Sequence, residues 1–469
     1  MSEPKNRIEK TKFSYKRAIS YSIGQISDIA SYQTFTFLTF TFYFAVVGLK
    51  IELIVLGFII WTFWNSFNDT VIGYLSDRTN TKYGRRIPWI MLSLVPIALM
   101  LFLLFTPPTS IGIMDEVLNF VYFFVIIILF ELFFTMYDIN YTSLYPEIFI
   151  TEEERAKGNN VRQLFAIVGL IAAFVLPGLF ITDYSDAQYI REYQLFGIVV
   201  GIIIICAGLL FLILTPKEKA EFSQDYKEAP SFFNTIKTCV KSKSFMRYIP
   251  AEIASWFVYG MLPTMVPLYV KYVLNEPVAL MASLLLLLTF LSAAIFMTIL
   301  WKPLVQKLGP RKTWLISMTT WIITLLPLMF IQDFLSGLIV FFLIGIGLSG
   351  SLYIIDIIIA DIVDEDEVNT GIRREGGYYG VNIFFQRLAT IFVFLAIGPV
   401  FLISDWQVYD PLNITPEIIF GLRSLMVIYP VIALVIAIIA IYFYPLDGKY
   451  LKQIKEQRDE IHQEKKSKI

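Results

Sequence analysis

Charged side chains are scarce in this sequence: Asp, Glu, Lys and Arg make up 16% of 469 residues, where soluble domains have about 25%. The chain has two cysteines, Cys206 in an apolar stretch and Cys239 in a polar one, so no disulfide framework is expected. The one histidine, His462, lies in the charged C-terminal segment, which excludes histidine-based metal sites inside the chain. The formal net charge of −1 gives no indication of a nucleic-acid partner.

The apolar residues, 57% of the chain, are gathered into long blocks separated by short charged segments. A helix that crosses a bilayer needs about 20 mostly apolar residues, and its backbone polar groups must bond within the helix. The blocks therefore predict an all-α integral membrane protein surrounded by lipid. Residues 1–17 are polar and basic without an apolar core, so no cleaved signal peptide is expected. The twelve predicted spans are 17–47, 51–76, 87–106, 116–146, 161–182, 193–215, 247–271, 277–301, 312–331, 335–362, 377–403 and 418–445.

The longest polar stretch between spans runs from Pro216 to Ser244 and separates six spans from six others. Each half carries a basic, glycine-containing turn after its second span, at Gly84–Arg86 and at Gly309–Lys312, which indicates internal duplication. The predicted organisation is an N-terminal arm over 1–16, a six-helix bundle over 17–215, a linker over 216–246, a second six-helix bundle over 247–445 and a charged tail over 446–469.

Lysine and arginine concentrate in the N-terminal arm, in the loops after the even-numbered spans, and in the tail. Loops rich in these residues stay on the cytoplasmic side of a membrane. Both termini are therefore expected in the cytoplasm, as an even number of spans also requires. The plasma membrane is the expected location.

Few ionisable residues fall inside the predicted spans, and nearly all of them are acidic. A charge at the middle of a bilayer costs at least about 2.5–3.5 kcal/mol, so each such residue is a functional candidate. One arginine cannot neutralise six carboxylates, and the imbalance predicts a site for a proton or another cation. The residues are Asp28, Asp69, Glu131, Asp138, Glu252, Asp356 and Arg387.

The second span places three oxygen-bearing side chains on one helix face, since Asn65, Asn68 and Asp69 are spaced i, i+3 and i+4. Oxygen ligands suit a hard cation such as sodium. A carboxylate at this depth could instead carry a proton. The alternative is that the three side chains only join neighbouring helices by hydrogen bonds.

The fourth and first spans carry further polar faces. Thr135 and Asp138 are three residues apart, with Glu131 two turns from Asp138, and all three are expected to face the bundle interior. In the first span, Asp28 and Tyr32 form an i, i+4 pair. A carboxylate beside an aromatic ring suits a sugar, which presents hydroxyls at its edge and C–H bonds on its faces. Tyr32 could equally form an interhelical hydrogen bond.

Arg387 lies about three turns into the eleventh span, too deep to reach water easily, so it is expected to meet a carboxylate or a ligand. Asp356 lies deep in the tenth span. Asp361 and Asp364, near the end of that span, are expected to join a loop network with the arginines at 373 and 374.

Two longer motifs carry a family resemblance. One begins at Asn68-Asp69 and continues through Gly73 and residues 77–79 to the Gly84–Trp89 segment. The other runs from residue 360 to residue 376. They resemble the signatures of the glycoside–pentoside–hexuronide:cation symporters, in the same loops of a twelve-span pattern. The resemblance covers essentially the whole chain and implies the major facilitator fold, with two six-helix bundles around a central cavity.

The resemblance implies a cation site at Asn68, Asp69 and Thr135, with Asn65 where the family has a second aspartate. One charge fewer weakens sodium binding and favours a proton. It also implies a sugar site at Asp28, Asp138 and Arg162, with Arg387 where the family has a lysine. Thr142 and Leu352 stand where the family has tryptophans that stack on sugar, so the particular sugar does not follow from the resemblance.

These observations predict a monomeric secondary transporter that moves a sugar or glycoside together with H⁺ or Na⁺, with no cofactor and no metal apart from Na⁺ at Asp69. The alternatives are a lysophospholipid transporter of the same superfamily and a non-transporting sensor or scaffold. An intramembrane enzyme is disfavoured, since the sequence has neither H-E-x-x-H nor G-x-S-x-G. The residues expected to latch the inward-closed state are Asp77, Arg78, Arg85, Arg86, Arg373 and Arg374.

Overall fold

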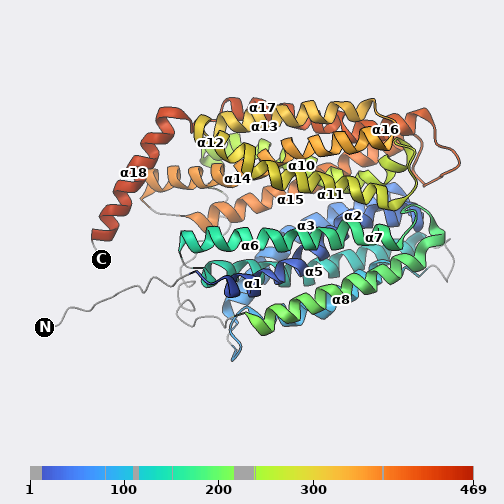
Figure 1. Cartoon of the computed structure of the whole chain (residues 1–469), viewed down its shortest axis with the longest axis horizontal. Coiled ribbons are helices and arrows are strands. Elements are labelled where there is room, and N and C mark those ends of the chain that lie inside the picture. The colour runs from blue at the N-terminus through green and yellow to red at the C-terminus, as the bar shows by residue number, and fades with distance from the viewer. Residues whose placement is uncertain are drawn as a thin grey trace.

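The computed structural model describes residues 13–79, 81–108, 116–149, 151–215, 237, 239–371 and 374–467. Within these ranges the chain is almost entirely helical, and the one extended pairing is a bridge between Thr81 and Gly84. Helices α1 to α8 form one group and α10 to α17 lie beside them as a second group, all roughly parallel to one long axis (Figure 1). The all-α prediction is confirmed. Most of the predicted linker, 216–236 and 238, lies outside the described residues.

The helices of the first group, called here the first bundle, are α1 (Tyr15–Ser22), α2 (Gly24–Thr41), η1 (Phe42–Val46), α3 (Ile51–Arg78), α4 (Ile87–Leu104), α5 (Glu116–Ile148), α6 (Glu152–Leu170), η3 (Ile171–Val175), α7 (Leu176–Phe180), η4 (Ala187–Tyr189) and α8 (Ile190–Leu214). Those of the second group, the second bundle, are α10 (Lys243–Tyr272), α11 (Ala279–Phe296), η7 (Met297–Trp301), α12 (Lys302–Leu308), α13 (Pro310–Leu325), η8 (Leu326–Met329), α14 (Phe334–Thr370), α15 (Glu375–Ile403), α16 (Pro416–Met426) and α17 (Ile428–Tyr442). The last helix, α18 (Gly448–Ser467), projects from one end.

Eleven helical stretches of the described residues are long and apolar enough to cross a membrane, and they coincide with the second to twelfth predicted spans. The largest differences are at the fifth, which begins at Glu153, and the tenth, which continues to Thr370. The first predicted span forms α1, α2 and η1. Its buried face is rich in polar side chains such as Ser31 and Thr34, which lowers its mean hydropathy.

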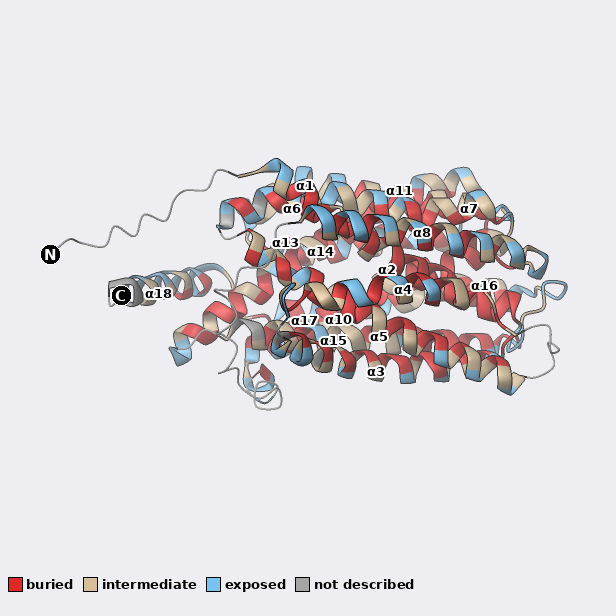
Figure 2. Cartoon of the chain, turned by 90° about the horizontal axis from the view of Figure 1, so that it is seen from below, coloured by how far each residue is buried: buried red, intermediate tan, exposed pale blue. Residues whose placement is uncertain are grey.

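Apolar side chains cover the outside of both bundles as well as filling them. Ile213 and Leu92 are 75% and 66% exposed, and many other large apolar residues on the outer helix faces are similarly exposed. Figure 2 shows exposed residues along the outer faces and buried residues where the helices meet. An apolar exterior of this extent is not stable in water and is expected for a surface that lipid covers.

Helix α14 is packed between α11 and α13 without room for a further methyl group. A Cβ atom at Gly345 would lie 1.8 Å from the Ser292 hydroxyl oxygen on α11. A Cβ at Gly347 would lie 2.3 Å from Cα of Trp321 on α13. The two glycines allow the helix backbones to approach closely, as small residues do in membrane bundles.

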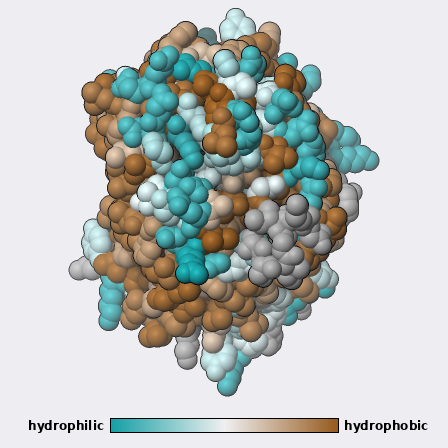
Figure 3. All heavy atoms as spheres, turned by 90° about the vertical axis from the view of Figure 1, so that its right-hand side faces the viewer, coloured by the Kyte–Doolittle hydropathy of each residue, from teal (hydrophilic) through white to brown (hydrophobic). Residues whose placement is uncertain are grey.

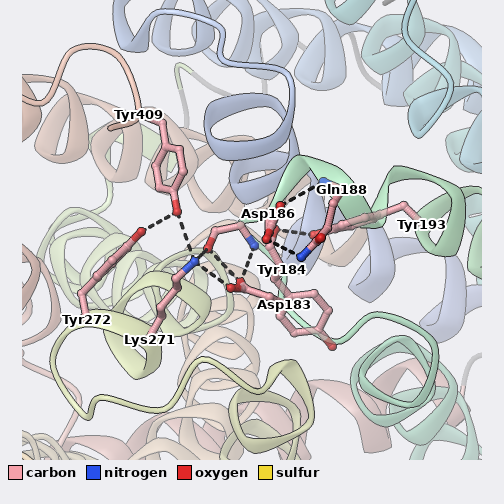
Figure 4. Close-up of polar contacts among 9 residues, drawn as sticks. Asp183, Tyr184, Asp186, Gln188, Tyr193, Lys271, Tyr272 and Tyr409 are labelled. Carbon is pink, nitrogen blue, oxygen red and sulfur yellow. Dashed lines mark hydrogen bonds and ion pairs between the residues drawn. The ribbon is translucent and has the colours of Figure 1, made fainter. Parts of the chain in front are cut away.

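The end of the molecule opposite α18, called here the far end, is closed by contacts between the two bundles. Lys271 of α10 lies 2.7 Å from an Asp183 carboxylate oxygen and donates to the Ser185 hydroxyl at 2.6 Å, in the first bundle. It also reaches the Tyr409 hydroxyl at 3.3 Å, and Tyr409 hydrogen-bonds to Tyr272 (Figure 4). Seen end-on, hydrophilic side chains gather on this face and apolar ones surround them (Figure 3). A charged contact thus joins the two bundles at the far end.

Replacement of Lys271 by methionine is expected to open the far end. The substitution removes one ion pair and the hydrogen bonds to a charged group, which are worth about 1.5–3 kcal/mol. That is roughly a tenfold to hundredfold change in the ratio of closed to open molecules. Electron–electron distance measurements between spin labels at exposed residues Gln188 and Val408 would detect a new population of longer distances.

The matched control for that measurement is Lys50→Met, which removes the exposed Lys50–Glu116 pair within the first bundle. It should leave the distance distribution unchanged. An unchanged distribution in Lys271→Met itself would show that the charged contact does not hold the far end shut.

Helix α18 packs on the end of α14 through ion pairs with buried acids. Lys455 lies 2.9 Å from Asp361, and Arg458 lies 2.6 Å from Asp364. His462 is 3.0 Å from Glu367. The sequence analysis assigned the two aspartates to a loop network and missed the cations of α18, because these follow almost 100 residues later in the chain. Of the two loop arginines, Arg374 pairs with Asp366, and 373 lies outside the described residues.

Arg458→Ala is expected to lower the free energy of unfolding by about 1.5–3 kcal/mol, because it weakens the pairing of a carboxylate whose side chain is only 6% exposed. Lys452→Ala is the control on the same helix, since Lys452 and its partner Glu456 are 79% and 62% exposed. Exposed i, i+4 pairs contribute about 0.3–0.5 kcal/mol. Thermal unfolding of the two purified variants measures the decrease in melting temperature that each substitution causes. Equal decreases would contradict the docking of α18 through Asp364.

Candidate functional site

A cavity of about 420 Å³ lies between the two bundles. Its walls come from α2, α3 and α5 on one side and from α10 and α15 on the other. Five of the predicted substrate-binding residues line it: Asp28, Tyr32, Asp138, Thr142 and Arg387. Thr142 is the exposed member and lies on α5 towards the α18 end, so this edge of the cavity is open to that end.

Asp69 lies at the centre of a polar cluster that joins four helices of the two bundles, α2, α3, α5 and α15. One of its carboxylate oxygens accepts a hydrogen bond from the Thr135 hydroxyl at 3.1 Å. The other lies 3.3 Å from the guanidinium of Arg387, on α15 of the second bundle. The same guanidinium reaches the Tyr32 hydroxyl at 3.4 Å. The predicted cation site and the predicted substrate site therefore meet at Arg387.

Glu131 extends the cluster away from the cavity. It is fully buried, and one of its oxygens lies 3.4 Å from the Thr135 hydroxyl, which places two carboxylates around one threonine. The Asn68 side-chain amide donates to the Glu131 backbone carbonyl at 3.2 Å, so Asn68 joins α3 to α5. Asn65 is fully buried, with no hydrogen-bond partner for its amide among the described residues. Asp69, Thr135 and Glu131 supply the oxygen atoms that could hold a proton or a small cation.

Asp28 and Asp138 form the carboxylate side of the cavity. The Gln25 amide donates to Asp28 at 2.8 Å, and the Thr142 hydroxyl donates to Asp138 at 3.1 Å. Arg162 of α6 is not among the cavity-lining residues, but its charge attracts both carboxylates. Its guanidinium lies over the Tyr145 ring, 5.0 Å from the centroid. Two acids held by neutral donors remain available to the hydroxyl groups of a ligand.

Asp356 stands apart from this group. It is exposed on α14 and does not line the cavity, although the positive charge of Arg162 also attracts its carboxylate. The sequence analysis included it because of its depth in the span. The structure places it towards the α18 end, on the helix that continues eight residues beyond the predicted boundary.

The residues expected to act as a latch lie at the α18 end. Arg85 and Arg86 both pair with Glu147 of α5, at 3.0 and 3.1 Å, within the first bundle. The Arg78 guanidinium lies over the Tyr74 ring. The pair of Arg374 with Asp366 stays within the second bundle. The side chain of Asp77 and residue 373 lie outside the described part of the chain.

The sequence analysis missed the contribution of α10 to the cavity. Trp256, Tyr259 and Gly260 all line it, and Gln33 of α2 donates to the Tyr259 hydroxyl at 3.0 Å across the two bundles. One signal was present in the sequence, because Glu252 and Trp256 are four residues apart and share a helix face. The intramembrane acid could have pointed to the aromatic residue.

Two helical bundles around a central cavity that is closed at one end and lined by aromatic and charged side chains, together with the family match, define this chain as a transporter of the major facilitator superfamily rather than an enzyme. Residues 20–448 match the family described as "MFS/sugar transport protein", and the chain belongs to that family. Within it, the chain is a member of the glycoside–pentoside–hexuronide symporters, as the sequence motifs predicted.

Curated relatives agree with this assignment, and a solved structure shows the same fold. The chain is 22% identical to "Glucuronide carrier protein homolog" of Escherichia coli, over 96% of each chain. It is 22% identical to "Isoprimeverose transporter" of Lactiplantibacillus pentosus, over 80% of this chain and 77% of the other. It is 20% identical to "Sodium-dependent lysophosphatidylcholine symporter 1" of Mus musculus, over 86% and 80%. The fold resembles the nucleoside transporter NupG, with a TM-score of 0.68 at 11% identity over 91% of this chain and all of that one.

Proposed function

We propose that this protein is a secondary symporter that couples the movement of a sugar or glycoside to that of a cation by alternating access. The observation that carries the proposal is the contact of Arg387 with Asp69. It joins a carboxylate that can bind a cation to a residue that lines the substrate cavity. Occupation of one site can therefore change the affinity of the other, which is the requirement for coupling.

A proton is the favoured coupling ion. Asp69 is the one carboxylate on its helix face, because Asn65 occupies the position one turn earlier. A proton on Asp69 would weaken its ion pair and free Arg387 to bind a substrate hydroxyl or carboxylate. Sodium would need several oxygen ligands, of which Asp69, Thr135 and Glu131 are the nearest candidates.

In alternating access, the contacts between the bundles at one end would break while contacts between the bundles at the other end form. The far-end contact of Lys271 with Asp183 would open. New contacts would then join the bundles at the α18 end. The residues proposed to make them are Asp77, Arg78, Arg85, Arg86, Arg373 and Arg374. The concentration of lysine and arginine at the α18 end supports a cytoplasmic location of that end, in a protein of the plasma membrane.

The test is a binding screen of the purified protein against a panel of glycosides, each at several pH values with and without sodium. Symport predicts that one or more glycosides bind, and that affinity depends on pH or on sodium. A glycoside affinity that changes with neither pH nor sodium would eliminate cation coupling at this site.

A lysophospholipid is the second candidate substrate, for a specific reason. Several phenylalanines line the cavity, among them Phe35, Phe40 and Phe134, and they would accommodate an acyl chain. The mouse relative is named for lysophosphatidylcholine. Displacement of a bound glycoside by other sugars but not by lysophosphatidylcholine would support the sugar assignment, and the reverse would support the lipid.

A further inference from the structure

The second bundle presents an aromatic wall to the cavity, opposite the carboxylates of the first. Trp256 and Tyr259 of α10 line it, with ring centroids 5.0 Å apart and planes at 66°. The space beside the adjacent Gly260 is open, since a Cβ there would approach only Val393, at 3.6 Å. Asp28 and Asp138 lie on the first-bundle side of the same cavity.

The indole of Trp256 is held from behind by a buried polar group. Its N–H donates to a Glu252 carboxylate oxygen at 3.1 Å, one helical turn earlier. The Asn382 amide of α15 donates to the same oxygen at 3.0 Å. Glu252 is fully buried, so both α10 and α15 fix the acceptor that orients the indole.

A fully buried carboxylate carries a large desolvation cost, so a chain retains one where it performs a task. The two hydrogen bonds of Glu252 indicate its role. Its carboxylate, held by Asn382, accepts the N–H of an indole whose ring borders the cavity and so fixes the orientation of that ring. Tyr259 is fixed in a similar way by Gln33. The aromatic wall is thus pre-organised before a ligand enters, which reduces the entropy lost on binding.

We propose that Trp256 is a stacking platform for the apolar face of a pyranose ring, and that Glu252 is the residue that positions it. A sugar ring has C–H bonds on its faces and hydroxyls at its edge. Stacked on Trp256, it turns its hydroxyls towards Asp28, Asp138 and Arg387. The proposal rests on the glycoside transport proposed above and names the group that selects a cyclic substrate.

The test measures calorimetric affinities of the full-length protein for the methyl glycosides of glucose, galactose, xylose and glucuronic acid. Trp256→Leu keeps an apolar side chain but removes the ring, and should weaken binding at least about tenfold, equivalent to 1.4 kcal/mol. Trp256→Phe should remain within a few-fold of the unmodified protein. Trp89→Phe is the control, because Trp89 lies at the start of α4 and is not a cavity-lining residue.

Glu252 is tested by a matched pair of substitutions. Glu252→Gln keeps an oxygen acceptor for the indole N–H and should preserve affinity, whereas Glu252→Ala should lose it by about the same factor as Trp256→Leu. Fluorescence adds a separate readout: because Trp61 also lines the cavity, the change on glycoside binding should become smaller in Trp256→Phe rather than vanish, and it should keep its full size in Trp89→Phe. Thermal unfolding curves identify any variant that is not folded.

Two results would overturn the proposal and are distinguishable. Binding of a methyl glycoside with unchanged affinity by Trp256→Leu removes the platform but leaves the proposed function intact. Binding of no glycoside by the unmodified protein overturns the proposed function and the platform together. Equal losses in Glu252→Gln and Glu252→Ala would remove the positioning role of Glu252 alone.

Discussion

Asp69→Asn is expected to abolish accumulation of substrate against its gradient while sparing substrate binding and exchange. Asparagine keeps the shape and an oxygen acceptor for Thr135, but it cannot gain or lose a proton. Moving one charge across a membrane potential of about 100 mV releases roughly 2.3 kcal/mol, which is enough to accumulate a coupled substrate about fortyfold. Without a titratable group at this position, proton movement is no longer coupled to substrate movement, so the potential cannot drive accumulation.

The measurement uses proteoliposomes with an imposed pH gradient and membrane potential. Labelled glycoside should equilibrate in Asp69→Asn vesicles and accumulate in unmodified ones. Asp410→Asn is the control, since it makes the same change in an exposed loop. Full accumulation by Asp69→Asn would rule out Asp69 as the coupling residue.

Arg387→Gln is expected to weaken glycoside binding by about thirtyfold or more. It removes the cation from a charge pair that is mostly shielded from solvent, with side chains 14% and 17% exposed, and truncation of a buried pair costs about 2–5 kcal/mol. Asp69, Glu131 and Asp138 would then lose the positive charge that attracts all three. The loss should appear in the affinity of the purified protein and also in uptake.

Arg387→Lys separates charge from geometry. Lysine keeps the positive charge but has no planar fork, so it should pair with Asp69 and lose the simultaneous contact with Tyr32. An intermediate affinity with coupling retained is expected. If Arg387→Gln bound glycoside as well as the unmodified protein, Arg387 would be a structural ion-pair residue and the link between the two sites would fail.

Much of the fold could be predicted from the sequence because lipid imposes a simple rule. A span must be apolar and about 20 residues long, so eleven of the predicted spans correspond to helices of the structure. The first corresponds to α1, α2 and η1, and its polar side chains face the bundle interior rather than lipid. Helix ends were less predictable where α14 and α6 extend beyond the apolar core into polar residues.

The candidate site could be predicted in part. Spacing on one helix was sufficient to group Asn65, Asn68 and Asp69. It could not show that Arg387 reaches Asp69 from a helix more than 300 residues later, since side-chain contacts between bundles leave no periodic pattern. Trp256 was missed because the sequence analysis did not extend from the intramembrane acid Glu252 to the aromatic residue one turn later, and the spacing of these two residues alone does not show that they border a cavity.

The close fit of α14 restricts how this transporter can move. With Ser292 and Trp321 in direct contact with its glycine positions, the helix cannot slide along or rotate against α11 and α13 without a collision. The three helices should therefore shift as one block. Most of the displacement would then fall at the seam between the bundles, where long side chains such as Lys271 and Arg387 can exchange partners. A compound that wedges this seam would stop the cycle without having to resemble the substrate.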